Sequence, residues 1–288
     1  MTLFTLLIIM ALERVSNKSK EFHITSIARK YFALLTSKSK IDISQPNLVG
    51  IIIIAGIPAL IMWILVVNLT GLLVFILYLL SLWICLGCPV TRKTFKRYLQ
   101  SANKEDFEAC SLHSISLGNV DGELSNVGKQ LILVNYRQYA SVILFFIFLG
   151  LPGMVFYSLI KELKSNQIEE ALDNIENDAE AQESANQTRN TLDEVLFILD
   201  WIPARLTAFG YLIVGHFSNG LVAWMDVIFN VNLPIYDLLA KVAKASEEHK
   251  ETQNIYLTEP LQMVKLAKRN IIFILMGLSI GTLVGVVA

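Results

Sequence analysis

Between Asp42 and Arg92 the chain passes through 49 consecutive residues without a single Asp, Glu, Lys or Arg. A membrane-spanning helix needs about 20 mostly apolar residues, so this stretch is long enough for two crossings. Over the whole chain 54% of residues are hydrophobic and 17% are charged, whereas soluble domains carry about 25% charged residues. The sequence therefore predicts an integral membrane protein whose first partner is the lipid bilayer.

The apolar stretches predict an all-α, polytopic membrane protein, because no alternating strand pattern occurs and four stretches are long enough to cross the hydrocarbon core. These four spans are 48–67, 71–90, 138–160 and 270–288. Two further stretches are ambiguous. Residues 2–12 are apolar but short, and residues 206–225 are divided by His216 and the Ser-Asn-Gly sequence that follows it. The second of these could be a full span, a half-span or a buried interfacial helix.

The spans and the charges together divide the chain into seven segments. The segments are 1–47, 48–91, 92–137, 138–160, 161–192, 193–269 and 270–288. Seven Lys and Arg residues lie in 13–42, seven in 92–137 and six in 226–269. Basic loops stay on the cytoplasmic side of membrane proteins, so we expect these three regions in the cytoplasm.

The segment 161–192 differs from the others because it is acidic, and we expect it to be a solvated helix or a linker. Its side of the membrane depends on the span before it. If 138–160 crosses once, the acidic segment faces away from the cytoplasm. The sequence Leu151-Pro152-Gly153 also permits a re-entrant segment, which would keep 161–192 cytoplasmic. The crossing arrangement is slightly favoured at this point.

A candidate site lies where Asp200, Pro203 and Arg205 follow one another at a membrane boundary. Pro203 is expected to begin a new helix, since proline is well tolerated in a first helical turn. The acid and the guanidinium could bind an anionic ligand, or they could pair across the bend as a structural clip. His216 is the one histidine in an apolar context, where a hydrogen bond to a neighbouring helix is the simpler role.

The remaining motifs point to packing rather than chemistry. Gly277, Gly281 and Gly285 form a doubled G-x-x-x-G pattern, which favours close helix packing against another helix of the chain or against a second subunit. Cys85 and Cys88 lack the further ligands that a zinc site needs, so no metal site is predicted. No cofactor motif is present either. A net charge of −1 argues against nucleic-acid binding.

The sequence from Asp200 to Thr207, Asp-Trp-Ile-Pro-Ala-Arg-Leu-Thr, resembles a motif of the CobD/CbiB cobinamide-phosphate synthases. Other features resemble AmpE, a membrane branch of the same superfamily. The matching residues are Met1 to Leu7 with Glu13-Arg14, Asn135-Tyr136-Arg137 with Tyr139, Gly215-His216, and Ala267-Lys268 before the last span. The resemblance thus extends from one end of the chain to the other.

The AmpE resemblance implies a regulatory protein of the bacterial inner membrane that takes part in β-lactamase induction. Its expected partners are a cell-wall recycling ligand or a protein of the pathway of AmpD, a cytoplasmic amidase of peptidoglycan recycling. The alternative is a divergent, ATP-dependent, amide-forming synthase. The synthases' Tyr-Arg pair is missing, since Ser158 follows Tyr157, and so is their Ser-Pro-Asn-Ala-Gly segment. These departures favour a protein without covalent chemistry. In either case Asp200, Arg205, Asn135 and Arg137 are the residues to examine.

Overall fold

The computed structural model describes residues 2–15, 20–38, 47–119, 122–173, 179–247 and 255–285. Parts of the predicted segments 1–47, 92–137, 161–192, 193–269 and 270–288 therefore lie outside the described residues. For residues 167–173 and 179–190 only the backbone is described.

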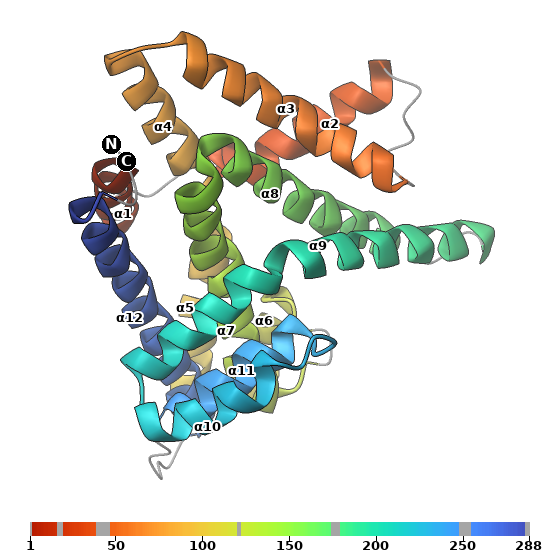
Figure 1. Cartoon of the computed structure of the whole chain (residues 1–288). Coiled ribbons are helices and arrows are strands. Elements are labelled where there is room, and N and C mark those ends of the chain that lie inside the picture. Colours follow the sequence, from red (N-terminus) through yellow and green to blue (C-terminus); the bar gives the residue numbers. More distant parts are fainter. Residues whose placement is uncertain are drawn as a thin grey trace. The chain divides into compact units, whose positions relative to one another are not determined.

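Every regular element in these ranges is helical and none is a strand, which confirms the predicted all-α class (Figure 1). The α-helices are α1 (Thr2–Val15), α2 (Ile24–Lys38), α3 (Leu48–Asn68), α4 (Leu72–Cys85), α5 (Pro89–Asn103), α6 (Phe107–Ser116), α7 (Val127–Asn135), α8 (Ser141–Asp173), α9 (Ala179–Val214), α10 (Phe217–Ile228), α11 (Ile235–Ser246) and α12 (Ile255–Leu283). Short 3-10 turns lie at Lys20–Phe22 and Leu124–Asn126, and a π-helix, η3, spans Tyr136–Ala140.

Five stretches of the described chain are long and apolar enough to cross a membrane, which confirms the polytopic class. They are α3, residues 72–103 from the start of α4 to the end of α5, the α7–α8 region, the C-terminal part of α9, and α12. Residues 206–225, for which the sequence left a full span, a half-span or an interfacial helix open, belong to two helices that part close to His216. Helix α9 ends at Val214 and α10 begins at Phe217, and the apolar helix of sufficient length is Thr191–Val214. Helix α4 also ends earlier than predicted, at Cys85, before Gly87 adopts a φ of 70°.

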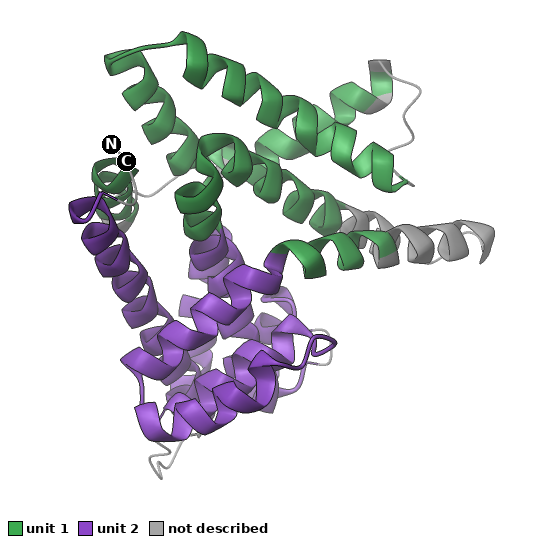
Figure 2. Cartoon of the chain, in the orientation of Figure 1, with its two compact units in different colours: residues 1–86, 142–199 green, residues 87–141, 200–288 purple. Residues whose placement is uncertain are grey.

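The chain forms two compact units, each built from two separate parts of the sequence (Figure 2). The first contains residues 1–86 and 142–199, and the second contains residues 87–141 and 200–288. In the first unit α1 packs on α4, where the Phe4 and Phe75 rings lie 6.2 Å apart. The Tyr31 hydroxyl ties α2 to α3 by donating to the Ile54 carbonyl at 3.0 Å.

Helix α8 bends sharply within the first unit (Figure 1). Gly150 has φ 66° and ψ −161°, a conformation that only glycine adopts readily, and Pro152 follows it. Phe145 and Tyr157 stack with their ring centroids 4.4 Å apart, although twelve residues of straight helix would span about 18 Å. The chain therefore turns back on itself, one residue before the Leu-Pro-Gly break that the sequence indicated.

The second unit has a helical core that α5, α6, α7 and α12 build together. Its buried members are Tyr98, Ala102, Cys110, Leu117, Val127, Leu131 and Val264. The Tyr98 hydroxyl donates to the Tyr256 carbonyl at 2.9 Å and so joins α5 to the start of α12. Helix α7 also packs against α11, and α11 packs against α10. Next to this core, η3 and α12 reach the C-terminal part of α9 through hydrogen bonds of Tyr136 and Asn270, and the candidate site lies there.

The bend in α8 predicts on which side of the membrane its C-terminal part emerges. Residues of α2, including Thr25 and Arg29, line one hollow together with Glu162, Ser165 and Asn166 of α8. Helix α2 and the C-terminal part of α8 are therefore expected on the same side of the membrane. In a variant without native cysteines, we expect Ser165→Cys to react with a membrane-impermeant maleimide from the side that labels Ser37→Cys in α2. Thr70→Cys, in the turn between α3 and α4, should react from the opposite side. Labelling of Ser165→Cys together with Thr70→Cys would instead establish a single crossing.

Candidate functional site

Asp200 is fully buried in the second unit, and a tyrosine hydroxyl reaches its carboxyl group. The Tyr136 hydroxyl donates to Asp200 Oδ1 at 2.8 Å, and Tyr136 is itself fully buried. A carboxyl group in apolar surroundings is costly unless a hydrogen bond compensates for the lost water. The phenol therefore supplies the partner that makes Asp200 tolerable at this depth.

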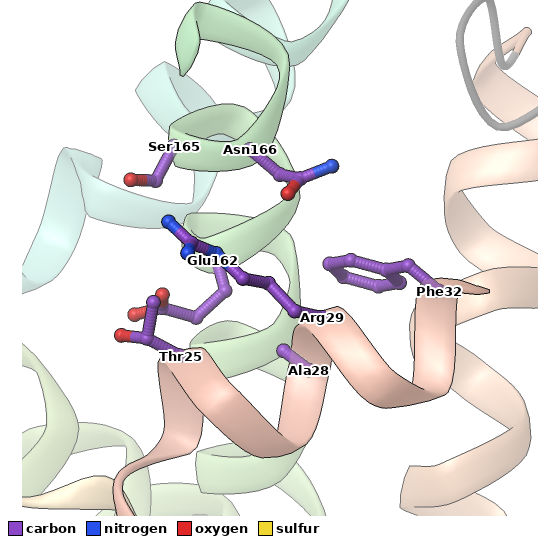
Figure 3. A pocket seen from close by; sticks show the side chains of 7 residues that line it. All are labelled: Thr25, Ala28, Arg29, Phe32, Glu162, Ser165 and Asn166. Atoms are coloured by element: carbon purple, nitrogen blue, oxygen red, sulfur yellow. The ribbon is translucent and has the colours of Figure 1, made fainter. Parts of the chain in front are cut away.

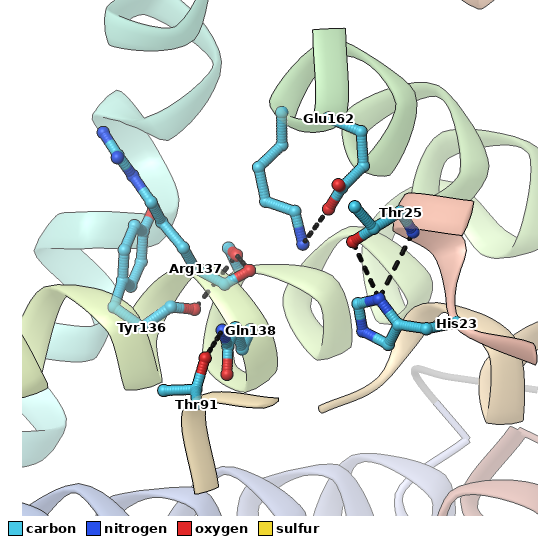
Figure 4. Close-up of polar contacts among 9 residues, drawn as sticks. His23, Thr25, Thr91, Tyr136, Arg137, Gln138 and Glu162 are labelled. Carbon is cyan, nitrogen blue, oxygen red and sulfur yellow. Dashed lines mark hydrogen bonds and ion pairs between the residues drawn. The ribbon is translucent and has the colours of Figure 1, made fainter. Parts of the chain in front are cut away.

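The π-helix η3 presents Tyr136 to Asp200. A π-turn breaks the regular pattern of backbone hydrogen bonds and is often found at functional sites. The Ser141 hydroxyl donates to the Tyr136 carbonyl at 3.0 Å and to the Arg137 carbonyl at 3.2 Å. These bonds give the carbonyls of Tyr136 and Arg137 a partner. The Gln138 side chain donates to the Thr91 hydroxyl at 3.0 Å and joins η3 to the start of α5 (Figure 4).

Arg205 is 9% exposed and binds backbone carbonyls. Its Nε donates to the Ile228 carbonyl at 3.1 Å and one Nη donates to the Asn230 carbonyl at 2.9 Å. The other Nη donates to the Trp201 carbonyl at 3.1 Å, while the guanidinium carbon lies 4.1 Å from the centre of the Trp201 ring. The last carbonyls of a helix carry partial negative charge and lack helical partners. Arg205 therefore caps the C-terminus of α10.

The structure gives Asp200 and Arg205 separate hydrogen-bond partners. The link that the sequence offered between the two side chains is therefore replaced by links from each of them to another element. Each residue joins α9 to a different element: Asp200 to η3 and Arg205 to the end of α10. The prediction that Pro203 begins a helix is wrong. It lies inside α9, which runs without interruption from Ala179 to Val214, and its carbonyl accepts a bond of 2.8 Å from the Thr207 hydroxyl.

His216 lies apart from these two residues, at the N-cap of α10, and is exposed. Its backbone N–H donates to the Ser246 carbonyl at 2.6 Å, and its Nδ1 lies 3.3 Å from the Ser218 hydroxyl. The bond to α11 is thus made by the backbone of His216, while its exposed side chain contacts Ser218 of its own helix; a side-chain bond to a neighbouring helix, which the sequence favoured, stays a prediction. The preceding Gly215 lets α11 approach, because a Cβ there would lie 2.3 Å from the Ser246 carbonyl oxygen.

Asn270 belongs to the site although the sequence reasoning did not single it out. It is 1% exposed, and its Nδ2 donates to the Thr207 carbonyl of α9 at 3.1 Å. A Cβ added to Gly210 would lie 1.9 Å from Asn270 Oδ1. The amide and the glycine thus fit together where α12 meets α9. The one available signal was an amide at the first position of the last apolar stretch.

Of the other sequence candidates, Asn135 donates its Nδ2 to the Leu131 carbonyl of its own helix at 2.8 Å. The Arg137 side chain is partly exposed and, within the described part of the chain, has no hydrogen bond or ion pair. Tyr136, between the two, makes the contact with Asp200. The Asn-Tyr-Arg motif therefore contributes mainly through its tyrosine.

In the first unit a polar hollow lies between α2 and α8 (Figure 3). Glu162 is buried there beside Arg29, and it pairs with Lys161 at 3.5 Å. Nearby, His23 Nδ1 lies 2.8 Å from the Thr25 hydroxyl (Figure 4). The hollow encloses about 170 Å³, including space open to solvent, whereas small-molecule pockets usually measure about 300–1,000 Å³. We therefore regard it as a packing seam.

The three cysteines are free thiols, and Cys85 and Cys110 are buried. Burial raises the pKa of the Cys110 thiol, and the negative charge of Asp106 raises it further. A thiol of this kind is a poor nucleophile at neutral pH. Among the described residues, no group of three or more His, Cys, Asp or Glu side chains is placed to hold a metal ion.

Comparison with known proteins places the whole chain in one family. Residues 1–288 match the family described as "Regulatory signalling modulator protein AmpE". The chain belongs to the AmpE family. It is also similar to Protein AmpE of Shigella flexneri, with 24% identity over 298 residues that cover 99% of each chain. No solved structure matches the chain. AmpE membership and the apolar helices together establish a regulatory, multi-pass membrane protein.

The contact between Tyr136 and Asp200 gives a first test in this AmpE-family protein. Tyr136→Phe removes the donor and leaves a buried carboxyl group without that bond, which should lower the free energy of unfolding by about 1–3 kcal/mol. The measurement is SDS-induced or thermal unfolding of the purified protein in detergent. Tyr139→Phe is the control, because the bond that its hydroxyl accepts from exposed Arg92 is long, 3.4 Å. Equal stability of the two variants would contradict the proposed role of Tyr136.

Two glycines on neighbouring helices should respond oppositely to the same substitution. Gly210→Ala forces a methyl group against Asn270 and should destabilise the protein by about 1–3 kcal/mol. A Cβ at Gly277 would meet no heavy atom within 4 Å, so Gly277→Ala should be neutral or stabilising by up to about 1 kcal/mol. Unfolding in detergent tests both. If Gly277→Ala instead weakens self-association in a crosslinking assay, the predicted glycine packing face contacts a second subunit.

Proposed function

We propose that this AmpE-family protein acts in the bacterial inner membrane as a regulator that couples the state of cell-wall recycling to β-lactamase induction. The observation that carries this proposal is the family match over the full chain. The contacts of the candidate site support it. Asp200 and Arg205, the strongest candidates for chemistry, are engaged by Tyr136 and by the end of α10.

A residue that links two helices suits regulation, because a change at one helix then alters the other. Arg205 joins α9 to the end of α10, and Asn270 joins α12 to α9. In this proposal a recycling ligand or a protein of the AmpD pathway shifts the balance between arrangements of these helices. A ligand can shift that balance only by binding one arrangement more tightly than the other.

The motif from Asp200 to Thr207 supports a further proposal, that the AmpE family shares an ancestor with the CobD/CbiB synthases. This relationship leaves a second candidate function, an ATP-dependent, amide-forming synthase. The position of Arg205 argues for regulation: its donors are directed at three backbone carbonyls, whereas a phosphate-binding arginine would direct them at the ligand.

Complementation of a gene deletion tests the proposed function. Without the gene, we expect changed β-lactamase induction by a β-lactam and a changed muropeptide pool, and the wild-type gene should restore both. Arg205→Ala should fail to restore them although it accumulates in the membrane, because the link between α9 and α10 is lost. Arg205→Lys, which keeps the charge but not the three-way hydrogen bonding, should restore them in part.

Two outcomes would count against this function. Unchanged induction and muropeptides in the deletion strain would contradict a regulatory role in cell-wall recycling. Growth of a cobinamide-phosphate synthase mutant on expression of this chain, lost with Arg205→Ala, would favour the synthase instead. Immunoblots of membrane fractions from every strain separate loss of function from loss of protein.

A further inference from the structure

Helix α5 carries four basic residues on one face, close to its beginning. Arg92, Lys93, Lys96 and Arg97 are all exposed, and we call them the basic face of α5. The opposite side of the helix is buried in the core of the second unit through Tyr98 and Ala102. The basic face is therefore fixed outward by packing.

Three of the four charges of the basic face, those of Lys93, Lys96 and Arg97, form no ion pair with the described residues. No Asp or Glu occurs from residue 43 to residue 104. Like charges three and four residues apart on a helix repel each other. This arrangement costs helix stability unless negative charge is supplied from outside.

The position of these charges along α5 adds to that cost. Pro89 is the first residue of the helix, so Arg92 and Lys93 lie in its first turns. The N-terminal end of a helix carries partial positive charge, which disfavours bases there and favours anions such as phosphate. Both the repulsion and the helix dipole therefore call for an external anion.

The basic face follows an apolar, membrane-spanning stretch closely in the sequence. The apolar helix α4 ends at Cys85 and α5 begins at Pro89, and four residues extend at most about 14 Å. Three hydrogen bonds hold the start of α5 to η3, where the apolar stretch of α8 begins. They join the Gly87 N–H to the Gln138 carbonyl, the Gln138 side chain to Thr91, and the Arg92 guanidinium to the Tyr139 hydroxyl.

We propose that the basic face of α5 binds the phosphate groups of anionic phospholipids. Several Lys and Arg residues directly after a membrane span attract anionic headgroups by charge, and the attraction fades within about 10 Å of the surface. The whole chain has a net charge of −1, so the attraction is local to this face and does not reflect a generally basic protein. The occupant is the lipid surface itself, since the face begins where the span ends. This binding does not depend on the proposed function.

The test uses the full-length protein in vesicles that contain spin-labelled phosphatidylglycerol or spin-labelled phosphatidylcholine. Electron paramagnetic resonance measures how much of each lipid is immobilised by the protein. We expect the wild type to prefer phosphatidylglycerol, and Lys93→Gln with Lys96→Gln to reduce this preference by roughly twofold or more. The matched control, Lys104→Gln with Lys129→Gln, removes the same charge from outside the basic face and should keep the preference.

Three results would overturn the proposal. The Lys93 and Lys96 variant could keep the wild-type preference, or the control could lose it equally, which would show a general charge effect. Inorganic phosphate could abolish the preference where sodium chloride of equal ionic strength does not, which would assign the face to soluble phosphate. Thermal unfolding in detergent checks that both variants are folded; Lys93, Lys96 and Lys104 are exposed and Lys129 is half-buried.

Discussion

Arg205 brings a permanent positive charge into apolar surroundings, and the fold near the end of α9 is arranged to accept it. The guanidinium has five N–H groups and cannot lose its charge, so it must find acceptors within the protein. The carbonyls of Ile228 and Asn230 supply two of them at the end of α10. That requirement fixes α10 against α9, and α10 in turn packs on α11.

The need for hydrogen-bond partners within the protein also bears on where the helices break. Backbone that leaves helical geometry at membrane depth must be satisfied by protein, because lipid offers no hydrogen bonds. At Gly150 the bend lies between buried stretches that include Phe146 and Met154. Between α9 and α10, the N–H of His216 is taken up by the Ser246 carbonyl. At the second break, therefore, α11 supplies the acceptor that the interrupted helix lacks.

Hydropathy was enough to predict the helical class, the two apolar helices α3 and α4, and the last span. A helix exposed to lipid needs an apolar side chain at nearly every position, and such a run is visible in the sequence itself. The pairing of Tyr136 with Asp200 could not be predicted in this way, although both lay in recognised motifs, since nothing local relates residues 64 positions apart. Pro203 was misassigned because a proline inside a helix and one at its start look alike in sequence. Asn270 was missed because its importance depends on Gly210, which is remote in the chain.

The candidate site and the basic face of α5 meet the same electrostatic demand in different ways. Arg205 is buried, so its acceptors had to be built into the fold as carbonyls at fixed positions. The lysines of α5 are exposed next to the membrane, where headgroup phosphates can neutralise them without any protein partner. Burial thus separates a cation that organises the protein from cations that orient it on the bilayer. A regulator in the membrane needs both kinds, because a signal passed between helices is useful only if those helices keep their place relative to the lipid.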